Sequence, residues 1–231
     1  MAGHGELVKF GDGKHFVVAG SNDARLVLYP IAAGKTDDTL LTNWVFAHRA
    51  AKDGSPLFGR EEWQGRADRA RCLKMLETFV IPDLDIHAFA SASENIWEYA
   101  MCDRSPLPQW SFGRVTLMGD AAHPMYPFGG NGAAQAILDA KSLAVQLARA
   151  NGDVTGALNA YEQERREKVY AVVISNRQGG PERVIDFVLS RLSRFDTNLE
   201  AVAPFEERKA IVHGYSQIAG YSADQLREAA C

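Results

Sequence analysis

Residues 113–147, GRVTLMGDAAHPMYPFGGNGAAQAILDAKSLAVQL, hold the most information about the fold of this chain. The run 114–118 is expected to be a short apolar strand that ends at a Gly-Asp pair. A loop with prolines and glycines follows, and a helix is expected to begin near Asn131. In open α/β sheets, ligands bind at the carboxyl ends of strands. We therefore expect an α/β fold with a ligand site in this stretch.

Two pieces of this stretch indicate a ligand. Asp120 directly follows the strand, where its carboxylate can accept hydrogen bonds from a sugar or polyol, and Gly119 lets a ligand approach the backbone. Gly130 and Gly132 expose backbone N–H groups at the helix start, which lacks intrahelical partners and attracts an anion. Each piece alone is also common as an ordinary turn or flexible loop. Together they favour a ligand site.

The helix after this loop carries its small and apolar residues on one stripe, and Asn151 and Gly152 end it. The stripe consists of Ala133, Ala136, Ile137, Ala140, Leu143, Ala144 and Leu147. This spacing predicts that the stripe is the buried face of the helix. The mixed charge run at 162–168 is interpreted as the solvated face of a second helix with i,i+4 pairs.

The rest of the chain predicts a sheet followed by helices. Turn signals and residues rich in β-branched and aromatic side chains indicate strands at 14–19, 24–31, 40–48 and 93–101. Helical periodicity and stop signals indicate helices at 61–79, 155–176, 182–194 and 205–219. The expected fold class is α/β, or α+β for these residues alone. It combines a mostly antiparallel sheet with a covering helix and C-terminal helices.

Composition excludes several classes of partner. Lys and Arg number 25 against 29 Asp and Glu, a net charge of -4 without a basic block, so nucleic acid is not an expected partner. No stretch reaches the roughly 18 apolar residues of a membrane span, and none resembles a signal peptide. The 3 cysteines and 6 histidines lack metal-ligand spacing, so we expect no metal, no membrane and a cytoplasmic location.

The motifs at 119–124 (GDAAHP), 127–133 (PFGGNGA) and 136–140 (AILDA) resemble the second FAD motif of single-component FAD-dependent aromatic hydroxylases. The sequence is most similar to the salicylate hydroxylase and phenazine monooxygenase group, and the resemblance spans nearly the whole chain. It implies FAD as cofactor, NADH or NADPH as co-substrate and a small aromatic substrate. In this family the reduced flavin forms a C4a-hydroperoxide that hydroxylates the ring, without a metal.

The resemblance also implies roles for individual residues. Asp120 would bind ribityl or ribose hydroxyls of FAD. The amides near Asn131, Gly132 and Ala133 would face the N1 and C2 carbonyl edge of the flavin, where a helix start stabilises negative charge. The carbonyl of Pro127 would face the substrate and the flavin ring. No catalytic residue is assigned.

Aromatic and apolar residues near these motifs are candidates for the substrate pocket. Tyr29, Trp44, Met125 and Phe128 are the substrate candidates, and core packing is an equally good interpretation of Tyr29 and Trp44. His123 lies beside the proposed flavin loop. In its GDAAHP context, we interpret it as a residue that hydrogen-bonds the backbone and shapes the turn rather than as a base.

The chain departs from the family pattern at its N-terminal side, because it has no strand-GxGxxG-helix unit for the pyrophosphate and no later Asp-Gly motif. We interpret 1–107 as the substrate-domain sheet with its covering helix, 108–178 as the C-terminal half of the FAD-binding domain and 179–231 as a helical cover. Three explanations stay open: a chain that lost its N-terminal half, a natural split enzyme, and a half-protein that binds an aromatic ligand or a partner without catalysis. A flavin-dependent epoxidase or dehalogenase is also compatible with these motifs, because the motifs indicate the flavin and not the substrate.

Overall fold

The computed structural model describes residues 1–8, 16–21, 23–49, 65–193 and 198–230. The chain divides into two compact units, Met1–Ala100 and Met101–Cys231, and each is described by itself. The division by function into 1–107, 108–178 and 179–231 stays a prediction. Within the described ranges, the helices are too short or too polar to cross a membrane.

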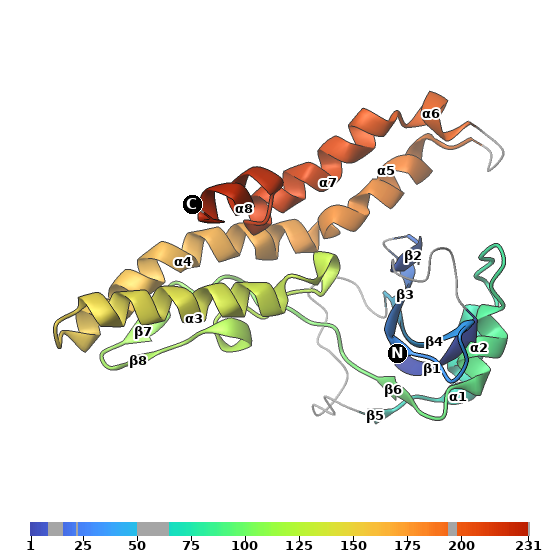
Figure 1. Cartoon of the computed structure of the whole chain (residues 1–231), viewed down its shortest axis with the longest axis horizontal. Helices are drawn as coiled ribbons and strands as arrows, with labels where there is room; N and C mark the ends of the chain where they lie inside the picture. Colours follow the sequence, from blue (N-terminus) through green and yellow to red (C-terminus); the bar gives the residue numbers. More distant parts are fainter. Residues whose placement is uncertain (9–15, 22, 50–64, 194–197, 231) are drawn as a thin grey trace. The chain divides into compact units, whose positions relative to one another are not determined.

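The first unit is built on an antiparallel sheet (Figure 1). Its strands, in spatial order, are β2 (Val17–Gly20), β3 (Ala24–Ala33), β4 (Thr39–His48), β1 (Ala2–Val8), β6 (Ile96–Glu98) and β5 (Gly65–Arg66). The expected α/β class with a mostly antiparallel sheet is confirmed. Strand β1 was not predicted from the sequence, because its two glycines hide the strand pattern, yet it pairs with β4 along its full length.

Two short helices cover one face of this sheet. Helix α1 (Arg69–Leu76) begins after Asp68, whose carboxylate accepts the N–H of Arg71, and α2 (Ile86–Ala92) begins after Asp85. The predicted helix over 61–79 is therefore too long: residues 65–66 form β5, and 61–64 lie outside the described residues. The predicted strand at 14–19 begins at Val17 within the described residues.

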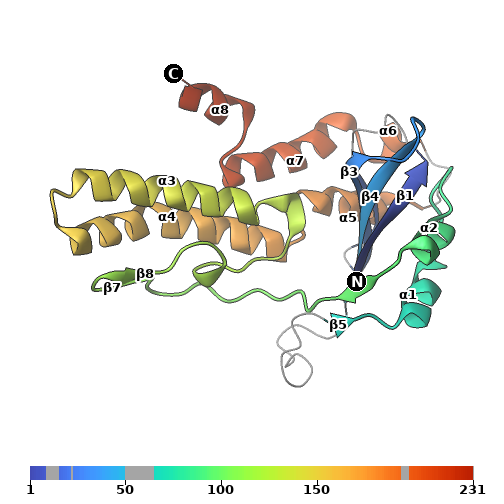
Figure 2. The ribbon, with the colours of Figure 1, turned by 60° about the horizontal axis from the view of Figure 1, so that its bottom comes forward.

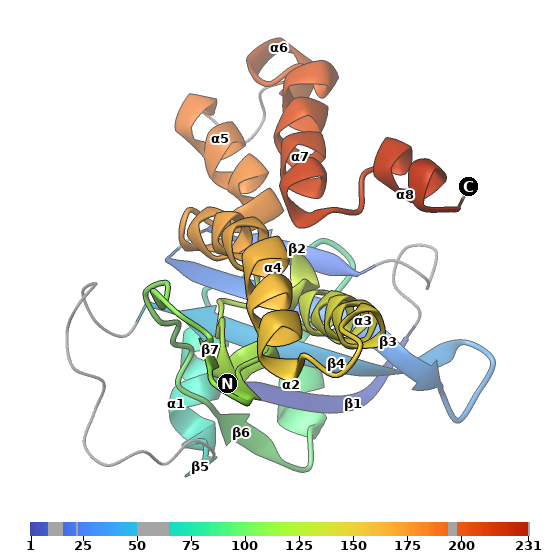
Figure 3. The same ribbon diagram turned by 90° about the vertical axis from the view of Figure 1, so that its left-hand side faces the viewer.

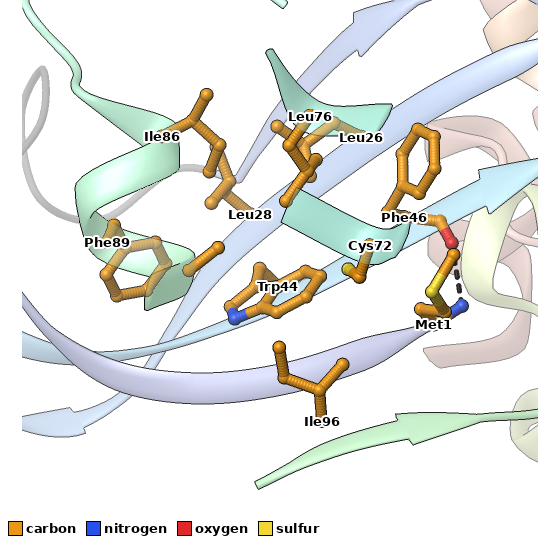
Figure 4. Close-up of a cluster of buried hydrophobic side chains, with 11 residues drawn as sticks. Met1, Leu26, Leu28, Trp44, Phe46, Cys72, Leu76, Ile86, Phe89 and Ile96 are labelled. Carbon is orange, nitrogen blue, oxygen red and sulfur yellow. Dashed lines mark hydrogen bonds between the residues drawn. The ribbon is translucent and has the colours of Figure 1, made fainter. Parts of the chain in front are cut away.

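The core of the first unit lies between the sheet and these helices (Figure 4). Its fully buried members include Leu26, Trp44, Phe46, Cys72 and Leu76. Side chains alternate between the two faces of a strand, so the neighbours of these strand residues point to the other face. That other face carries exposed apolar residues of β3, including Tyr29 and Ile31.

The second unit is mainly helical (Figures 1 and 2). It begins with the hairpin β7 (Ser111–Phe112) and β8 (Val115–Thr116), followed by the 3-10 turns η1 (Gly119–Ala121) and η2 (Phe128–Gly130). Its remaining elements are α3 (Gly132–Arg149), α4 (Val154–Arg177), η3 (Gly180–Glu182), α5 (Arg183–Arg191), α6 (Leu199–Val202), α7 (Phe205–Ala219) and α8 (Ala223–Ala230). Helices α3 and α4 lie side by side, and α7 packs on α4 (Figure 3).

The buried face of α3 is the opposite of the predicted one. Its buried residues are the polar Gln135, Asp139 and Ser142, whereas Ile137 is 69% exposed and Leu147 is 41% exposed. The physical reason is that the polar face of α3 makes hydrogen bonds to polar and charged side chains of α4. Leu143 is the member of the stripe that packs on the apolar cluster containing Tyr161 and Val169 of α4. Ile137 and Leu147 of the predicted stripe are therefore exposed, whereas Leu143 is half-buried.

The charge run on α4 was also misinterpreted. Glu162 and Arg165 are buried, and each bonds a partner from another element: Glu162 accepts the N–H of Ser111 at 2.8 Å, and Arg165 bonds α3. Only the pair Arg166 and Glu162, at 3.0 Å, is an i,i+4 contact of the expected kind. Glu162 and Arg165 of this run thus lie in the protein interior and not on a solvated helix face.

Candidate functional site

The turn that carries Asp120 is tightly closed. Gly119 has a φ of 56°, a left-handed conformation that favours glycine, and its carbonyl accepts the N–H groups of Ala122 and His123, each at 2.9 Å. Asp120 lies at the middle of this turn and is exposed to solvent. Asp120 thus lies on an exposed turn after the short strand β8, and its contact with a ligand stays a prediction.

A second aspartate, Asp139 of α3, is hydrogen-bonded to both ends of this turn. Its Oδ2 atom accepts the backbone N–H of Gly119 at 3.0 Å and a bond from His123 Nε2 at 2.6 Å. Its Oδ1 atom accepts a bond from Arg165 Nε at 2.8 Å. One buried carboxylate thus anchors both ends of the turn that presents Asp120.

The environment of Asp139 favours its ionised form. Burial by itself would raise the pKa of this carboxyl, but the hydrogen bonds from His123, Arg165 and the Gly119 N–H lower the pKa below its ordinary value. Because an ionised carboxylate only accepts hydrogen bonds, His123 donates through Nε2. His123 therefore shapes the turn, as the sequence suggested, although its side-chain partner is a carboxylate and not the backbone.

The loop before α3 turns twice through left-handed glycines. Gly129 has a φ of 70° and Gly130 a φ of 63°, and the Gly130 N–H donates to the carbonyl of Pro127 at 3.0 Å. The side chain of Asn131 is buried and donates from Nδ2 to the Gly129 carbonyl and to the Tyr215 hydroxyl, both at 3.1 Å. Asn131 can therefore offer a ligand its backbone N–H but not its amide group.

The start of α3 leaves room for a bound group. Apart from the adjoining backbone, a Cβ atom built on Gly130 or Gly132 would meet no atom within 4 Å among the described residues. The first amides of α3 also lack intrahelical acceptors because of helix geometry. A Cβ on Gly119 would lie 3.4 Å from Ala136 Cβ, so the Asp120 turn packs directly on the first turns of this helix. The structure thus brings the Asp120 turn and the glycine loop to the same end of α3.

The four substrate candidates divide between the two units. Trp44 is fully buried in the core of the first unit, where Nε1 donates to Ser93 Oγ at 2.9 Å, whereas Tyr29 is exposed on the opposite sheet face. This burial favours the packing interpretation of Trp44. Met125 and Phe128, in the second unit, are half-buried. Substrate contacts by all four residues stay predictions.

Several residues that shape the site were missed by sequence reasoning. They are Asp139, Arg165, Asn176, Glu182 and Tyr215. Asp139 lies inside the quoted AILDA motif, and its position on the polar side of the helix was a usable signal. The others lie far along the chain from the turn or loop that they contact, so no local pattern indicates them.

Comparison with known proteins identifies the family to which these features belong. Residues 58–175 match the model of a family described as FAD binding domain. The chain is 41% identical over 175 residues to phenazine 1,6-dicarboxylic acid hydroxylase PhzS of Lysobacter antibioticus, covering 74% of this chain and 42% of that protein. It is 31% identical over 156 residues to 3-hydroxybenzoate 6-hydroxylase 2 of Aquipseudomonas alcaligenes, covering 67% and 44%. These matches confirm the resemblance that the motifs indicated.

A solved structure shows the same fold. The salicylate hydroxylase substrate complex aligns with a TM-score of 0.64 at 18% identity, covering 96% of this chain and 56% of that one. At this identity the likeness shows the fold alone. The chain spans less than half the length of the two curated relatives, 42% and 44%.

Proposed function

Because the chain belongs to the FAD binding domain family, we propose that it forms part of a flavin-dependent monooxygenase that hydroxylates an aromatic substrate. The observation that carries this proposal is the start of α3, where open space beside Gly130 and Gly132 adjoins helix amides without intrahelical acceptors. FAD, when bound, supplies the redox chemistry: it accepts a hydride from NADH or NADPH and activates dioxygen.

In this proposal, residues of the second unit would line one side of FAD. Asp120 is exposed and would accept hydrogen bonds from ribityl or ribose hydroxyls. The backbone N–H groups of Asn131, Gly132 and Ala133 would stabilise negative charge on the flavin edge through hydrogen bonds and the helix dipole. The Pro127 carbonyl already accepts one bond within the loop and has a second lone pair for a neighbour.

The names of the two relatives support an aromatic carboxylic acid as the substrate. One relative is named for phenazine 1,6-dicarboxylic acid and the other for 3-hydroxybenzoate. In the second unit, Met125 and Phe128 would supply apolar contacts to the ring and exclude water from it. In the first unit, Tyr29 is a separate candidate for an apolar contact on the exposed face of the sheet. Trp44 would support the sheet from its other face.

We further propose that these residues form the C-terminal part of the active unit and need an N-terminal partner segment. Ile137 and Leu147 of the apolar stripe of α3 are exposed, and the β7–β8 hairpin exposes Phe112 and Val115. Exposed apolar residues of this kind are candidate contacts for a partner segment. The missing segment would cover this surface and supply the pyrophosphate site, so the chain alone is expected to have weak or no activity.

Complementation tests this function. The chain would be mixed with FAD and the N-terminal half of the Lysobacter hydroxylase, and NADH and NADPH oxidation would be followed with and without phenazine or hydroxybenzoate carboxylates. We expect oxidation that depends on both halves and yields a hydroxylated product. Binding of the aromatic acid by the chain, without FAD binding or hydroxylation in any mixture, would instead favour the noncatalytic half-protein.

A further inference from the structure

One peptide bond of the glycine loop, between Phe128 and Gly129, is held by residues from the C-terminal helices. The Gly129 N–H donates to both carboxylate oxygens of Glu182, at 3.0 and 3.1 Å. On the other side, the Tyr215 hydroxyl lies 3.1 Å from the Phe128 carbonyl oxygen, which is one of two acceptors within reach of its single proton. The two partners lie 53 and 87 residues further along the chain. The orientation of this peptide is therefore set from outside the loop.

Tyr215 is the centre of this arrangement. It is fully buried, and its hydroxyl also accepts from Asn131 Nδ2 at 3.1 Å and lies 2.8 Å from Asn176 Oδ1, its alternative acceptor. Burial raises the pKa of Tyr215 to about 12, so the hydroxyl keeps the proton that it donates. Asn176 in turn donates to the Tyr126 carbonyl at 2.8 Å.

Packing reinforces these hydrogen bonds. A Cβ atom on Gly129 would lie 2.6 Å from the Tyr215 ring, so the loop backbone rests directly on this side chain. Glycine tolerates many backbone conformations, and a loop with Gly129, Gly130 and Gly132 needs outside contacts to keep one of them. Tyr215 and Glu182 supply such contacts.

We propose that Tyr215 and Glu182 are positioning residues for the flavin, because they hold the Phe128–Gly129 peptide in the orientation that leaves the start of α3 open. This inference rests on the proposed function and extends it to the C-terminal helices. Rotation of the peptide would break the bonds to both residues and exchange the positions of a carbonyl oxygen and an N–H group in the loop. In this proposal, the C-terminal segment positions the flavin loop in addition to covering the domain.

Amide hydrogen exchange on the FAD-free chain tests whether the peptide is held. Tyr215→Phe keeps the ring but removes the hydroxyl, and we expect the Gly129 and Gly130 amides to exchange roughly three- to tenfold faster, as for the loss of one hydrogen bond. Core amides of α4, such as that of Val172, should keep their rates. Tyr221→Phe is the matched control, because Tyr221 is exposed and its ring lies beside Tyr215, and it should leave all these rates unchanged.

Glu182 provides a rescue experiment. Glu182→Gln keeps one oxygen that can accept the Gly129 N–H, whereas Glu182→Ala keeps none. We expect fast Gly129 exchange in the alanine variant and nearly normal exchange in the glutamine variant. Equal exchange in the two variants, or faster exchange spread evenly over α4 and the loop, would show that these residues only stabilise the fold.

FAD titration then tests the consequence for the cofactor. With the N-terminal half present, Tyr215→Phe and Glu182→Ala should weaken FAD binding several-fold and change the visible circular dichroism of the bound flavin, whereas Tyr221→Phe should do neither. Wild-type FAD affinity in variants with a loosened peptide would overturn the positioning role. Failure of the unchanged chain to bind FAD would count against the proposed function, and the exchange data would still decide whether the peptide is held.

Discussion

Two aspartates at the same end of α3 have opposite environments and different roles. Asp120 is exposed on its turn, whereas Asp139 is fully buried and accepts bonds from Gly119, His123 and Arg165. An exposed carboxylate contributes little to folding and is free for a ligand, whereas a buried one with three donors stabilises the structure that surrounds it. Substitution of each residue should separate ligand binding from stability.

For Asp120→Ala, we expect FAD affinity of the complemented protein to fall by roughly one to two decades. The reason is the loss of charge-assisted hydrogen bonds of about 1.5 to 3 kcal/mol. The free energy of unfolding of the chain should change by less than about 0.5 kcal/mol, as for other exposed positions. Flavin fluorescence titration and urea unfolding measure the two effects. Unchanged affinity together with an unstable chain would make Asp120 a structural turn residue.

For Asp139→Asn, we expect the chain to lose about 3 kcal/mol of stability at neutral pH, because Arg165 and His123 lose a charged partner. The folded-state pKa of Asp139 is lowered, so its contribution is fully present above the unfolded pKa of about 4 and is lost as pH falls through the folded value. The stability difference between wild type and variant should shrink below about pH 4. Asp120→Asn is the exposed control, and a difference independent of pH would contradict the role given to Asp139.

At the scale of elements, the positions of β3, β4 and the long helices followed from sequence patterns, but strands β1 and β5 and the buried face of α3 did not. Helix α7 matches its predicted range, and α3 and α4 begin and end within two residues of theirs. The face of α3 was wrong because its apolar stripe suggested burial, whereas a buried Asp139 and Arg165 decided the packing. A periodic pattern shows that a helix has two faces, and the neighbouring element determines which face is covered.

Gly132→Val tests the start of α3 as a flavin site. Gly132 does not need a left-handed backbone, and its Cβ position is open in the protein, so valine should leave the fold intact. It should meet the bound flavin instead and weaken FAD binding at least tenfold in the complemented protein. Gly214→Val in α7 is the matched control, since that site is equally open and also free of a left-handed backbone. Equal FAD affinity in both variants would remove this loop from the site.

Ile137→Gln tests the exposed stripe of α3. Because Ile137 is 69% exposed, the substitution should change the thermal stability of the chain very little. It should weaken association with the N-terminal half, which analytical ultracentrifugation would measure. Ile174→Gln on α4, also at an exposed isoleucine, should leave association unchanged. A loss of stability in the isolated Ile137→Gln chain would contradict the exposure of this face.

At the scale of the whole molecule, the sequence indicated the glycine loop before α3 but not the residues that hold it in place. The motifs at 119–124 and 127–133 are local in sequence, and their chemistry could be interpreted residue by residue. Glu182 and Tyr215 contact the Phe128–Gly129 peptide from positions 53 and 87 residues further along the chain. Contacts over such sequence distances leave no periodic pattern in the sequence. Likewise, only the comparison with relatives shows that this chain covers 42% and 44% of their lengths, and its amino-acid composition does not indicate this.

We propose that this chain carries one side of an FAD site and needs a partner segment for the other. The most direct measurement is the visible absorption of the chain after equilibration with FAD and gel filtration, alone and together with the N-terminal half of the Lysobacter hydroxylase. We predict that the chain alone elutes colourless or with a small fraction of FAD, whereas the mixture elutes as a yellow complex with one FAD per chain. Full FAD occupancy of the isolated chain would contradict the need for a partner, and a colourless mixture would contradict the FAD site itself.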